Sequence, residues 1–529
     1  MLLNALPLLA PLVLLAAAFA PRHVAGMDAR KGARLAEVAA LGAVAIAILS
    51  AVVLAANGSG DSFLIGAFGI GLSVRLDVVS VVMLLLVSFI GWVVVRYART
   101  YLDGEERHPA FTFWLLVTLA TVLALVQSGN LVQFVAAWVA TSMFLHRLLI
   151  FYPERMAARR AARKKYVMAR IGDMALIAAA TLLTITYGTT QISGILAQAS
   201  QGIGGGMAVG AAGLIALAAV LKSAQFPTHG WLTEVMEAPT PVSALLHAGV
   251  VNAGGFALIR LADVMLLSPL TMAALVMIGG FTALFGGLVM LTQPTVKASL
   301  AWSTIAQMGF MILQCGLALF PLALLHIVAH SLYKAHAFLS AGGAVERIVA
   351  IRKPGPVAVP DLGAVARAFV VALVIYGIVY AVLGVGFDFG GKSPQAVALG
   401  AILIFGVAYL LAQGFADAAP RALTRRTATY AAAVTLSYLL LQRASEWLTA
   451  GTLPATPVAG PLEWSLIILA LISFGFVAVA QATLPLWAYH PAAQGLRVHL
   501  SNGLYINAIS DRILGGWTHD TTSENGAAK

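Results

Sequence analysis

A lysine lies in the middle of a long apolar run near the centre of the chain. Lys222 occurs in the stretch LKSAQFPTHGWLTEV, well inside a run that follows a loop without basic residues. At 1.5 Å per helical residue, Lys222 is about 24 Å from the outer end of this run, in the middle third of a bilayer. Burial makes the charged form of a lysine less favourable, so a lysine at this depth can exchange protons. We therefore predict that Lys222 carries protons; the alternative is a lysine that extends from a helix end to the bilayer surface.

Histidines in two later apolar runs can also accept and release protons. His247 lies in APTPVSALLHAGVVNAGG, and imidazole changes its charge near neutral pH. Taken alone, a histidine on an apolar face is more often a hydrogen-bonded packing residue, but the position of His247 after the Lys222 run favours a relay. His326, His330 and Lys334 in LLHIVAHSLYKAHAFLSAGG are spaced four apart. They share one face of a helix over about 12 Å, which is typical of a proton wire along or across the membrane.

A metal site is the alternative for this histidine row, because His at i and i+4 can bind zinc. No Glu follows His326 as in HExxH, and no third ligand is nearby, so we expect no metal ion. The single cysteine, Cys315, lies in an apolar run, which excludes a disulfide framework and a cysteine-based iron–sulfur or zinc site. The sequence has no motif for a nucleotide or redox cofactor, so none is expected.

Four further ionisable residues extend the candidate relay. Lys297 begins the run TVKASLAWSTIAQMGF and is either a relay member or an anchor at the cytoplasmic surface. Asp173 in ARIGDMALI lies one helical turn after Arg170 and either joins the relay or pairs with that arginine. Glu234 and Glu237 follow the lysine run and can collect protons at its cytoplasmic mouth. Ionisable residues inside membrane helices are costly, which is why we treat them as functional candidates.

The elements that position these residues are membrane helices. Of 529 residues, 60% are hydrophobic and only 10% are charged, against about 25% charged in a soluble protein. Apolar runs long enough to cross a bilayer as helices recur along the whole chain, whereas a β-barrel would have short alternating segments. We predict an all-α polytopic membrane protein with fifteen spans: 2–20, 34–55, 74–95, 110–127, 130–151, 165–187, 206–236, 240–261, 266–290, 298–319, 321–343, 364–386, 395–416, 427–446 and 463–487.

The seventh span, 206–236, is too long for one straight crossing. It contains Pro227 beside the polar Gln225, Thr228 and His229, so we predict one helix that is broken in the middle. A break frees backbone carbonyls and admits water, which can hydrate the nearby Lys222. The predicted segments are residues 1–109 (N-terminal helices), 110–261 (a first repeat with the broken helix), 262–446 (central helices and a second repeat) and 447–529 (the last span and a tail).

The basic residues follow the alternation of the loops. Loops after odd-numbered spans are rich in Arg and Lys, above all Arg155, Arg159, Arg160, Arg163, Lys164 and Lys165, and also Arg347, Arg352 and Lys353. Loops 56–73, 188–205 and 447–462 have neither residue type. The odd loops are therefore predicted to be cytoplasmic, with the N-terminus periplasmic and the C-terminal tail inside. The net charge of +11 follows from these loops, so we expect no nucleic-acid partner.

Residues 222–260 resemble the signature of the antiporter-like subunits of respiratory complex I and of Mrp-type cation/proton antiporters. TVKASLAWSTIAQMGFM and LLHIVAHSLYKAHAFLSAGG match the same superfamily, and RYARTYLDGEERHPAFTFWL is similar to its largest complex I subunit. The resemblance covers residues 70 to 345. It implies two inverted five-helix repeats, each with a broken helix, and relay roles for Lys222, His247, His326, His330 and Lys334.

Other segments resemble the DabB family, the membrane subunits of the DAB inorganic-carbon accumulation systems. The segment WVATSMFLHRLLIFYPERMAARRAARKKYVMARIGD and the tail LRVHLSNGLYINAISDR carry this resemblance. It implies a proton-conducting subunit, not itself an enzyme, in a bacterial inner membrane. Its implied partner is a DabA-like soluble, zinc-binding, carbonic-anhydrase-like subunit that hydrates CO2 to bicarbonate. The alternatives are a pump subunit of a complex I-type NADH dehydrogenase and an Mrp-type antiporter subunit.

Departures from the complex I pattern favour the DabB family. Complex I subunits carry a glutamate directly after a tryptophan in the fifth span, whereas this chain has Val139 after Trp138. Spans 12 and 13 hold no interior Lys or Glu, and the tail has no room for a long lateral helix. Without the glutamate, Lys222 either has a lower pKa or finds another partner. Asp173 is one candidate because spans 6 and 7 are consecutive, and His146 is another because it lies seven residues after Val139 on roughly the same helix face.

Overall fold

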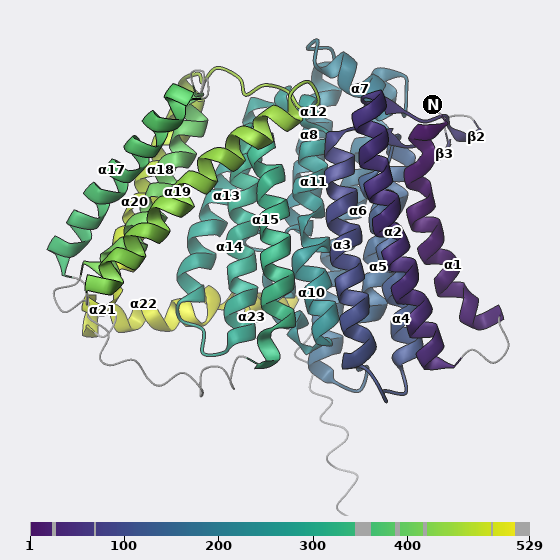
Figure 1. The fold of residues 1–529 in the computed structure, drawn as a ribbon, viewed down its shortest axis with the longest axis horizontal. Coiled ribbons are helices and arrows are strands. Elements are labelled where there is room, and N and C mark those ends of the chain that lie inside the picture. The colour runs from purple at the N-terminus through teal and green to yellow at the C-terminus, as the bar shows by residue number, and fades with distance from the viewer. Residues whose placement is uncertain are drawn as a thin grey trace, which may run out of the picture.

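The computed structural model describes residues 2–23, 28–67, 70–343, 361–386, 392–415, 421–487 and 490–513. Most of these residues lie in helices that run side by side (Figure 1). Thirteen of the helices in these ranges are long and apolar enough to cross a membrane. The chain is therefore an all-α polytopic membrane protein, as the sequence predicts.

The N-terminal helices follow the predicted spans closely. Asp28, Asp77 and Asn130 each accept a hydrogen bond from the backbone amide three residues later, at the starts of α2, α3 and α5, which satisfies one of the free amides of a helix end. The elements are η1 (Leu3–Leu8), α1 (Leu9–His23), α2 (Ala29–Asn57), α3 (Val78–Tyr101), α4 (His108–Val126) and α5 (Leu131–Leu149).

Two short antiparallel ribbons lie between α2 and α3. Strand β1 (Gly60–Asp61) pairs with β4 (Arg75–Leu76), and β2 (Ile65–Ala67) pairs with β3 (Ile70–Leu72). The prediction that the third span begins at residue 74 is therefore wrong, since α3 begins at Val78. The ribbons give the backbone of this loop hydrogen-bond partners, and they fix the start of the helix.

The sixth span begins nine residues earlier than predicted. Helix α6 (Met156–Tyr187) includes the basic cluster that the sequence analysis assigned to a loop. Ala, Arg, Lys and Met are among the strongest helix formers, so the segment MAARRAARKKYVMAR continues the helix beyond the apolar run. As a result Lys164 and Lys165 are buried helical residues, not loop residues.

The seventh span is broken where the sequence predicts. Helix α8 (Gly205–Lys222) ends at the lysine, residues 223–229 are not helical, and α9 (Gly230–Glu234) and η2 (Val235–Glu237) follow. Pro227 in the gap has no amide hydrogen and disfavours a helical residue before it. The short α7 (Ile192–Ala199) precedes α8 in the loop.

The eighth span is interrupted as well, which the sequence analysis missed. In place of one helix over 240–261, the chain forms α10 (Thr240–Ala248), η3 (Val250–Asn252) and α11 (Ala253–Arg260). Gly249 has non-helical backbone angles between α10 and η3. The central helices that follow are α12 (Ala262–Leu266), α13 (Pro269–Met290), α14 (Val296–Gly316), α15 (Phe320–Leu339) and η4 (Ala341–Gly343).

The C-terminal helices are α17 (Leu362–Gly386), α18 (Pro394–Gly414), α19 (Arg421–Thr449), α20 (Pro461–Ala482) and α21 (Leu484–Trp487). Helices α18 and α19 are the two predicted spans that are not among the thirteen apolar helices. Helix α19 runs obliquely across the bundle (Figure 1) and carries charged residues near both ends. The helices α22 (Pro491–Ser501), η5 (Gly503–Tyr505) and α23 (Ile506–Ile513) lie along the bottom of the bundle in Figure 1.

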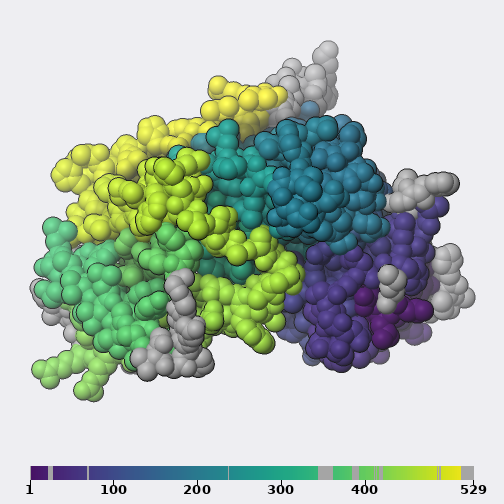
Figure 2. Space-filling view, turned by 90° about the horizontal axis from the view of Figure 1, so that it is seen from above, coloured from purple at the N-terminus to yellow at the C-terminus, as the bar shows by residue number. Residues whose placement is uncertain are grey.

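Two groups of helices form separate hydrophobic cores. The larger core joins α1 to α15, and a smaller one joins α17, α18, α19 and α20. A third cluster, with Leu313, Leu399 and Ile467, connects α14 to α18 and α20. Seen from above, the N-terminal and C-terminal helices occupy opposite ends of an elongated molecule (Figure 2). The inverted symmetry and the segment boundaries stay predictions from the sequence.

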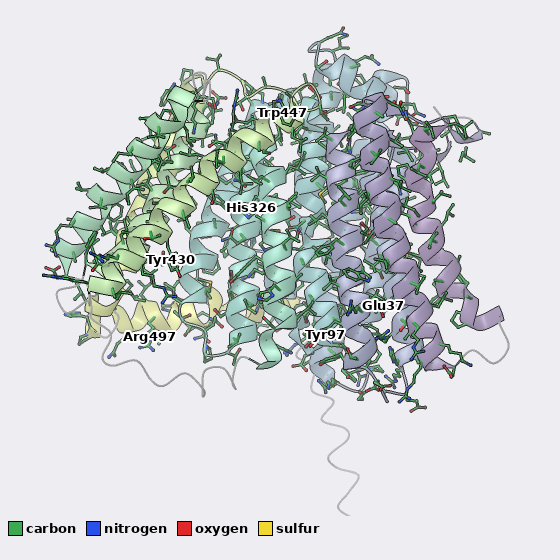
Figure 3. The ribbon with its side chains drawn as sticks, viewed as in Figure 1. Glu37, Tyr97, His326, Tyr430, Trp447 and Arg497 are labelled. Carbon is green, nitrogen blue, oxygen red and sulfur yellow. The ribbon has the colours of Figure 1, made fainter. Side chains whose placement is uncertain are left out.

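The basic starts of several helices lie on one side of the molecule. The basic starts of α2, α6 and α19 lie at the lower side in Figure 1, opposite the N-terminus. Arg99 near the end of α3 pairs with Glu37 at this side, where Figure 3 places Glu37. The basic residues Arg347, Arg352 and Lys353 lie outside the described residues. We refer to the basic side as the lower face.

Candidate functional site

Lys222 is buried at the end of α8, against Ser142 and Trp138 of α5. Lys222 is 7% exposed, and its ammonium donates a hydrogen bond to the Ser142 hydroxyl. The Lys222 Nζ atom also lies 4.4 Å from the centre of the Trp138 ring, a cation–π distance. The lysine thus sits against α5 inside the bundle and does not extend to the surface.

A second buried lysine, missed by the sequence analysis, reaches the same residue of α5. Lys165 is 4% exposed, and its Nζ donates a 2.8 Å hydrogen bond to the Ser142 carbonyl oxygen. The sequence signal was present: Lys165 lies eight residues before Asp173, two turns along the same stripe of a helix. It was obscured because Lys165 ends a run of basic residues that suggested a loop.

A buried carboxylate of α6 acts electrostatically on Lys222. Asp173 is buried, forms an ion pair with Arg170, and attracts both Lys222 and Lys165 electrostatically. Val139 is half-buried. Asp173 thus pairs with Arg170, one of the two possibilities weighed from the sequence, and its role as a relay partner of Lys222 stays a prediction.

His146, the other candidate partner, lies one turn beyond Ser142 on α5. Its ring stacks at a tilt on Tyr166, with 5.3 Å between ring centres, and it is close enough to Lys165 and Arg170 for electrostatic repulsion. His146 is therefore nearer to the second lysine and the lower face than to Lys222.

A second cluster is formed where α10, α14 and α15 meet. Fully buried His247 faces Thr304 across a 3.1 Å hydrogen bond, and its ring stacks on Phe338 with 4.5 Å between centres. Lys334, also fully buried, donates to the Leu300 carbonyl oxygen at 3.0 Å. Two groups of α14, the Thr304 hydroxyl and the Leu300 carbonyl, thus give hydrogen-bond partners to His247 of α10 and Lys334 of α15.

The cluster continues up α15 through both histidines. The rings of His330 and His326 lie 6.0 Å apart, and His326 Nδ1 is 2.8 Å from the Gln314 amide oxygen. Figure 3 shows His326 well above the level of Arg497 on α22. Because α15 crosses the membrane along its length, the row of His326, His330 and Lys334 runs across the bilayer and not within its plane.

The two clusters meet at the interrupted eighth span. The Ser223 hydroxyl, next to Lys222, donates to the Val251 carbonyl oxygen at 2.9 Å. The Asn252 amide donates to the Ser331 hydroxyl at 2.8 Å, next to His330. Within the parts of the chain that are described, no hydrogen bond joins Lys222 directly to His247. The break at 249–252 is the polar connection between α8 and α15.

The glutamates proposed as a proton-collecting mouth lie in a dense ionic cluster at the lower face. Glu234 pairs with Lys164 and Arg160, and Glu237 pairs with Arg155. Lys164 also pairs with Asp511 of α23 at 2.7 Å. Lys297 lies in the first turn of α14, half-buried, one turn before the Leu300 carbonyl that accepts from Lys334.

A buried ion pair on the side opposite the lower face was not predicted. Arg260, at the end of α11, forms two hydrogen bonds to the Asp77 carboxylate, and Arg75 adds a third at 2.8 Å. Burial opposes the ionisation of Asp77, but the two arginines outweigh it and hold the pKa of Asp77 well below its usual value. This pair fixes the start of α3 to the end of α11.

The described residues contain no group of three or more His, Cys, Asp or Glu side chains that could hold a metal ion. Cys315 is fully buried among apolar residues. What the site offers chemically is a set of amines, imidazoles, hydroxyls and one carboxylate at membrane depth. These groups can bind, pass and release protons.

Residues 128–355 match the transmembrane family described as NADH:quinone oxidoreductase/Mrp antiporter, and residues 63–112 match the family of complex I chain 5 N-termini. The chain is 38% identical over 453 residues to the probable inorganic carbon transporter subunit DabB2 of Halothiobacillus neapolitanus, covering 84% of this chain and 80% of that protein. It is 45% identical over 269 residues to the probable subunit DabB of Hydrogenovibrio crunogenus, covering 50% of this chain and 52% of that protein.

Two solved structures are similar in fold. The Mrp complex from a Dietzia species contains a chain that matches 96% of this chain and 59% of its own length, with a TM-score of 0.63 and 24% identity. The archaeal membrane-bound sulfane sulfur reductase contains a chain that matches 90% of this chain and 74% of its own length, with a TM-score of 0.56 and 18% identity. The likeness to both is one of fold.

Proposed function

The chain belongs to the DabB family of inorganic carbon transporter subunits, and from this premise we propose that it conducts protons for an inorganic carbon accumulation complex. The observation that carries the proposal is the pair of buried ionisable clusters, one around Lys222 and one along α15. Such groups are expensive inside a membrane and mark ion or proton pathways.

In this proposal protons cross from the periplasm to the cytoplasm down the proton-motive force. The α15 row spans part of the bilayer, Lys222 and Asp173 form the second centre, and Glu234, Glu237 and Lys297 serve the cytoplasmic side. The basic lower face supports a cytoplasmic assignment. The N-terminus is then periplasmic, in a bacterial inner membrane.

The partner is a DabA-like soluble subunit that binds zinc and hydrates CO2 to bicarbonate. Proton flow through the membrane subunit makes hydration run in one direction. The chemistry of hydration belongs to the partner, and the membrane subunit is an energy-coupling protein, not an enzyme. The alternative, a complex I-type or Mrp-type pump subunit, is favoured by the family match at 128–355, while Val139 in place of glutamate counts against it.

The test is a host that lacks carbonic anhydrase and cannot grow in ambient air. Co-expression of this chain with its zinc subunit should restore growth and bicarbonate accumulation, and an uncoupler should abolish the accumulation. The matched control is Lys222→Ala at equal abundance in the membrane. Accumulation that persists after complete loss of the proton-motive force would reject the coupling role.

A further inference from the structure

Lys165 shares the Lys222 centre, and we propose that it is a second proton-carrying amine, through which protons pass between Lys222 and the lower face. The inference deepens the proposed proton conduction and rests on it. The helix α6 that carries Lys165 begins at Met156 on the lower face. At 1.5 Å per residue, Lys165 is about 14 Å from that end, between the surface and the level of Asp173.

One residue of α5 binds both amines. The Lys222 ammonium donates to the Ser142 hydroxyl, and Lys165 donates to the carbonyl oxygen of the same residue at 2.8 Å. Ser142 therefore holds the amines of both Lys222 and Lys165. The two lysines also line a common cavity of about 10 Å³, together with Leu145, Trp231 and Leu246 on three different helices, a volume that admits about one water molecule.

The charges at this centre do not balance when every group is ionised. Lys222, Lys165 and Arg170 are three cations, and Asp173 is the one buried carboxylate that attracts all three. His146 beside Lys165 adds repulsion when it is protonated. Like charges in a low-dielectric site cannot all be held at once, and the arginine does not release its proton. One of the two lysines is therefore the group that gives its proton up.

A neutral amine beside a charged one forms a proton-exchange pair. An N–H bond of the Lys222 ammonium breaks as an N–H bond forms on the neutral Lys165 amine, with one water molecule in the shared cavity taking up a proton and releasing another. One positive charge moves from one amine to the other, and no atom is gained or lost. The Ser142 hydroxyl and carbonyl hold both amines in reach during the exchange.

The test uses the assembled complex with its partner subunit in proteoliposomes, with proton flux measured by a pH-sensitive dye and normalised to the amount of recovered complex. Lys165→Gln keeps a donor for the Ser142 carbonyl, and Lys165→Arg keeps the charge but does not release a proton. Both variants are expected to lose flux by about 100-fold. Arg163→Gln is the matched control, because Arg163 is exposed on the same helix, and it should keep the flux of the unmodified protein.

A Lys165→Arg variant with near-normal flux would overturn the inference, since Lys165 would then act only as a positive charge. Loss of the assembled complex in both variants would overturn it too, because Lys165 would be a structural residue. If the unmodified complex carries no flux that depends on Lys222, the proposed function itself fails. If Lys165→Gln keeps normal flux while Lys222→Ala loses it, the inference about Lys165 fails and the proposed function stands.

Discussion

The Ser142 hydroxyl offers a narrow test of how Lys222 is held. Ser142→Ala removes the oxygen that accepts from the Lys222 ammonium but leaves the backbone carbonyl that Lys165 uses. A hydrogen bond to a charged group contributes about 1.5–3 kcal/mol. Since each 1.4 kcal/mol is a factor of ten in an equilibrium constant, the ratio of charged to neutral Lys222 should fall by about 10- to 100-fold, and we expect a lower proton flux.

The assay is proton flux into proteoliposomes that contain the assembled complex. Thr141→Val is the matched control: Thr141 is the neighbouring residue of α5, it is buried, and its hydroxyl donates to the Ala137 carbonyl oxygen and not to the lysine. Flux in Ser142→Ala within twofold of the unmodified protein, while Lys222→Ala is inactive, would refute the reasoning. Lys222 would then be solvated by groups other than this serine.

Four further predictions concern the same pathway and its scaffold. Lys222→Ala and Lys222→Arg should both abolish transport while the complex still assembles, because a guanidinium does not release its proton; near-normal transport in Lys222→Arg would make the lysine a purely electrostatic residue. Val139→Glu should reduce transport, since a second carboxylate beside Asp173 would hold Lys222 as an ion pair, and unchanged flux would contradict this. Arg260→Ala should lower the free energy of unfolding in detergent by about 3–5 kcal/mol, because it leaves Asp77 buried beside only the more exposed Arg75; an unchanged thermal transition would count against it. Cysteines placed at exposed Arg160 and Ser200 should react with an impermeant thiol reagent from the cytoplasm and the periplasm respectively, against a background in which Cys315 is fully buried, and the reverse pattern would overturn the topology.

The sequence predicts those features that depend on local chemistry. Apolar runs give the positions of the membrane helices, and Pro227 gives the break after Lys222, because each effect acts within a few residues. The histidine row on α15 follows from helical spacing alone. The sequence also indicates Asp173 as a partner for Lys222, since consecutive helices tend to be adjacent.

What the sequence does not reveal depends on contacts between distant segments. Lys165 looks like a loop residue until α6 is extended to Met156 and packed against α5. The interruption at Gly249 has no proline to mark it, and two of its polar groups bind Ser223 after α8 and Ser331 on α15. The pairing of Asp77 with Arg260 joins residues 183 positions apart, so no local pattern announces it.

The contact of α23 with the lower face affects the order in which the protein is completed. Asp511 and Asn507 of α23 bind Lys164 and Thr233, which flank the lower end of the broken helix. Ribosomes add α23 after α6 and α9, so both helices are made long before Asp511 exists, and domains generally fold from the N-terminus during synthesis. The ionic cluster of Lys164, Glu234 and Asp511 is therefore closed only after α23 is translated, and a nascent chain that already contains Lys222 in the bilayer still lacks the carboxylate of Asp511.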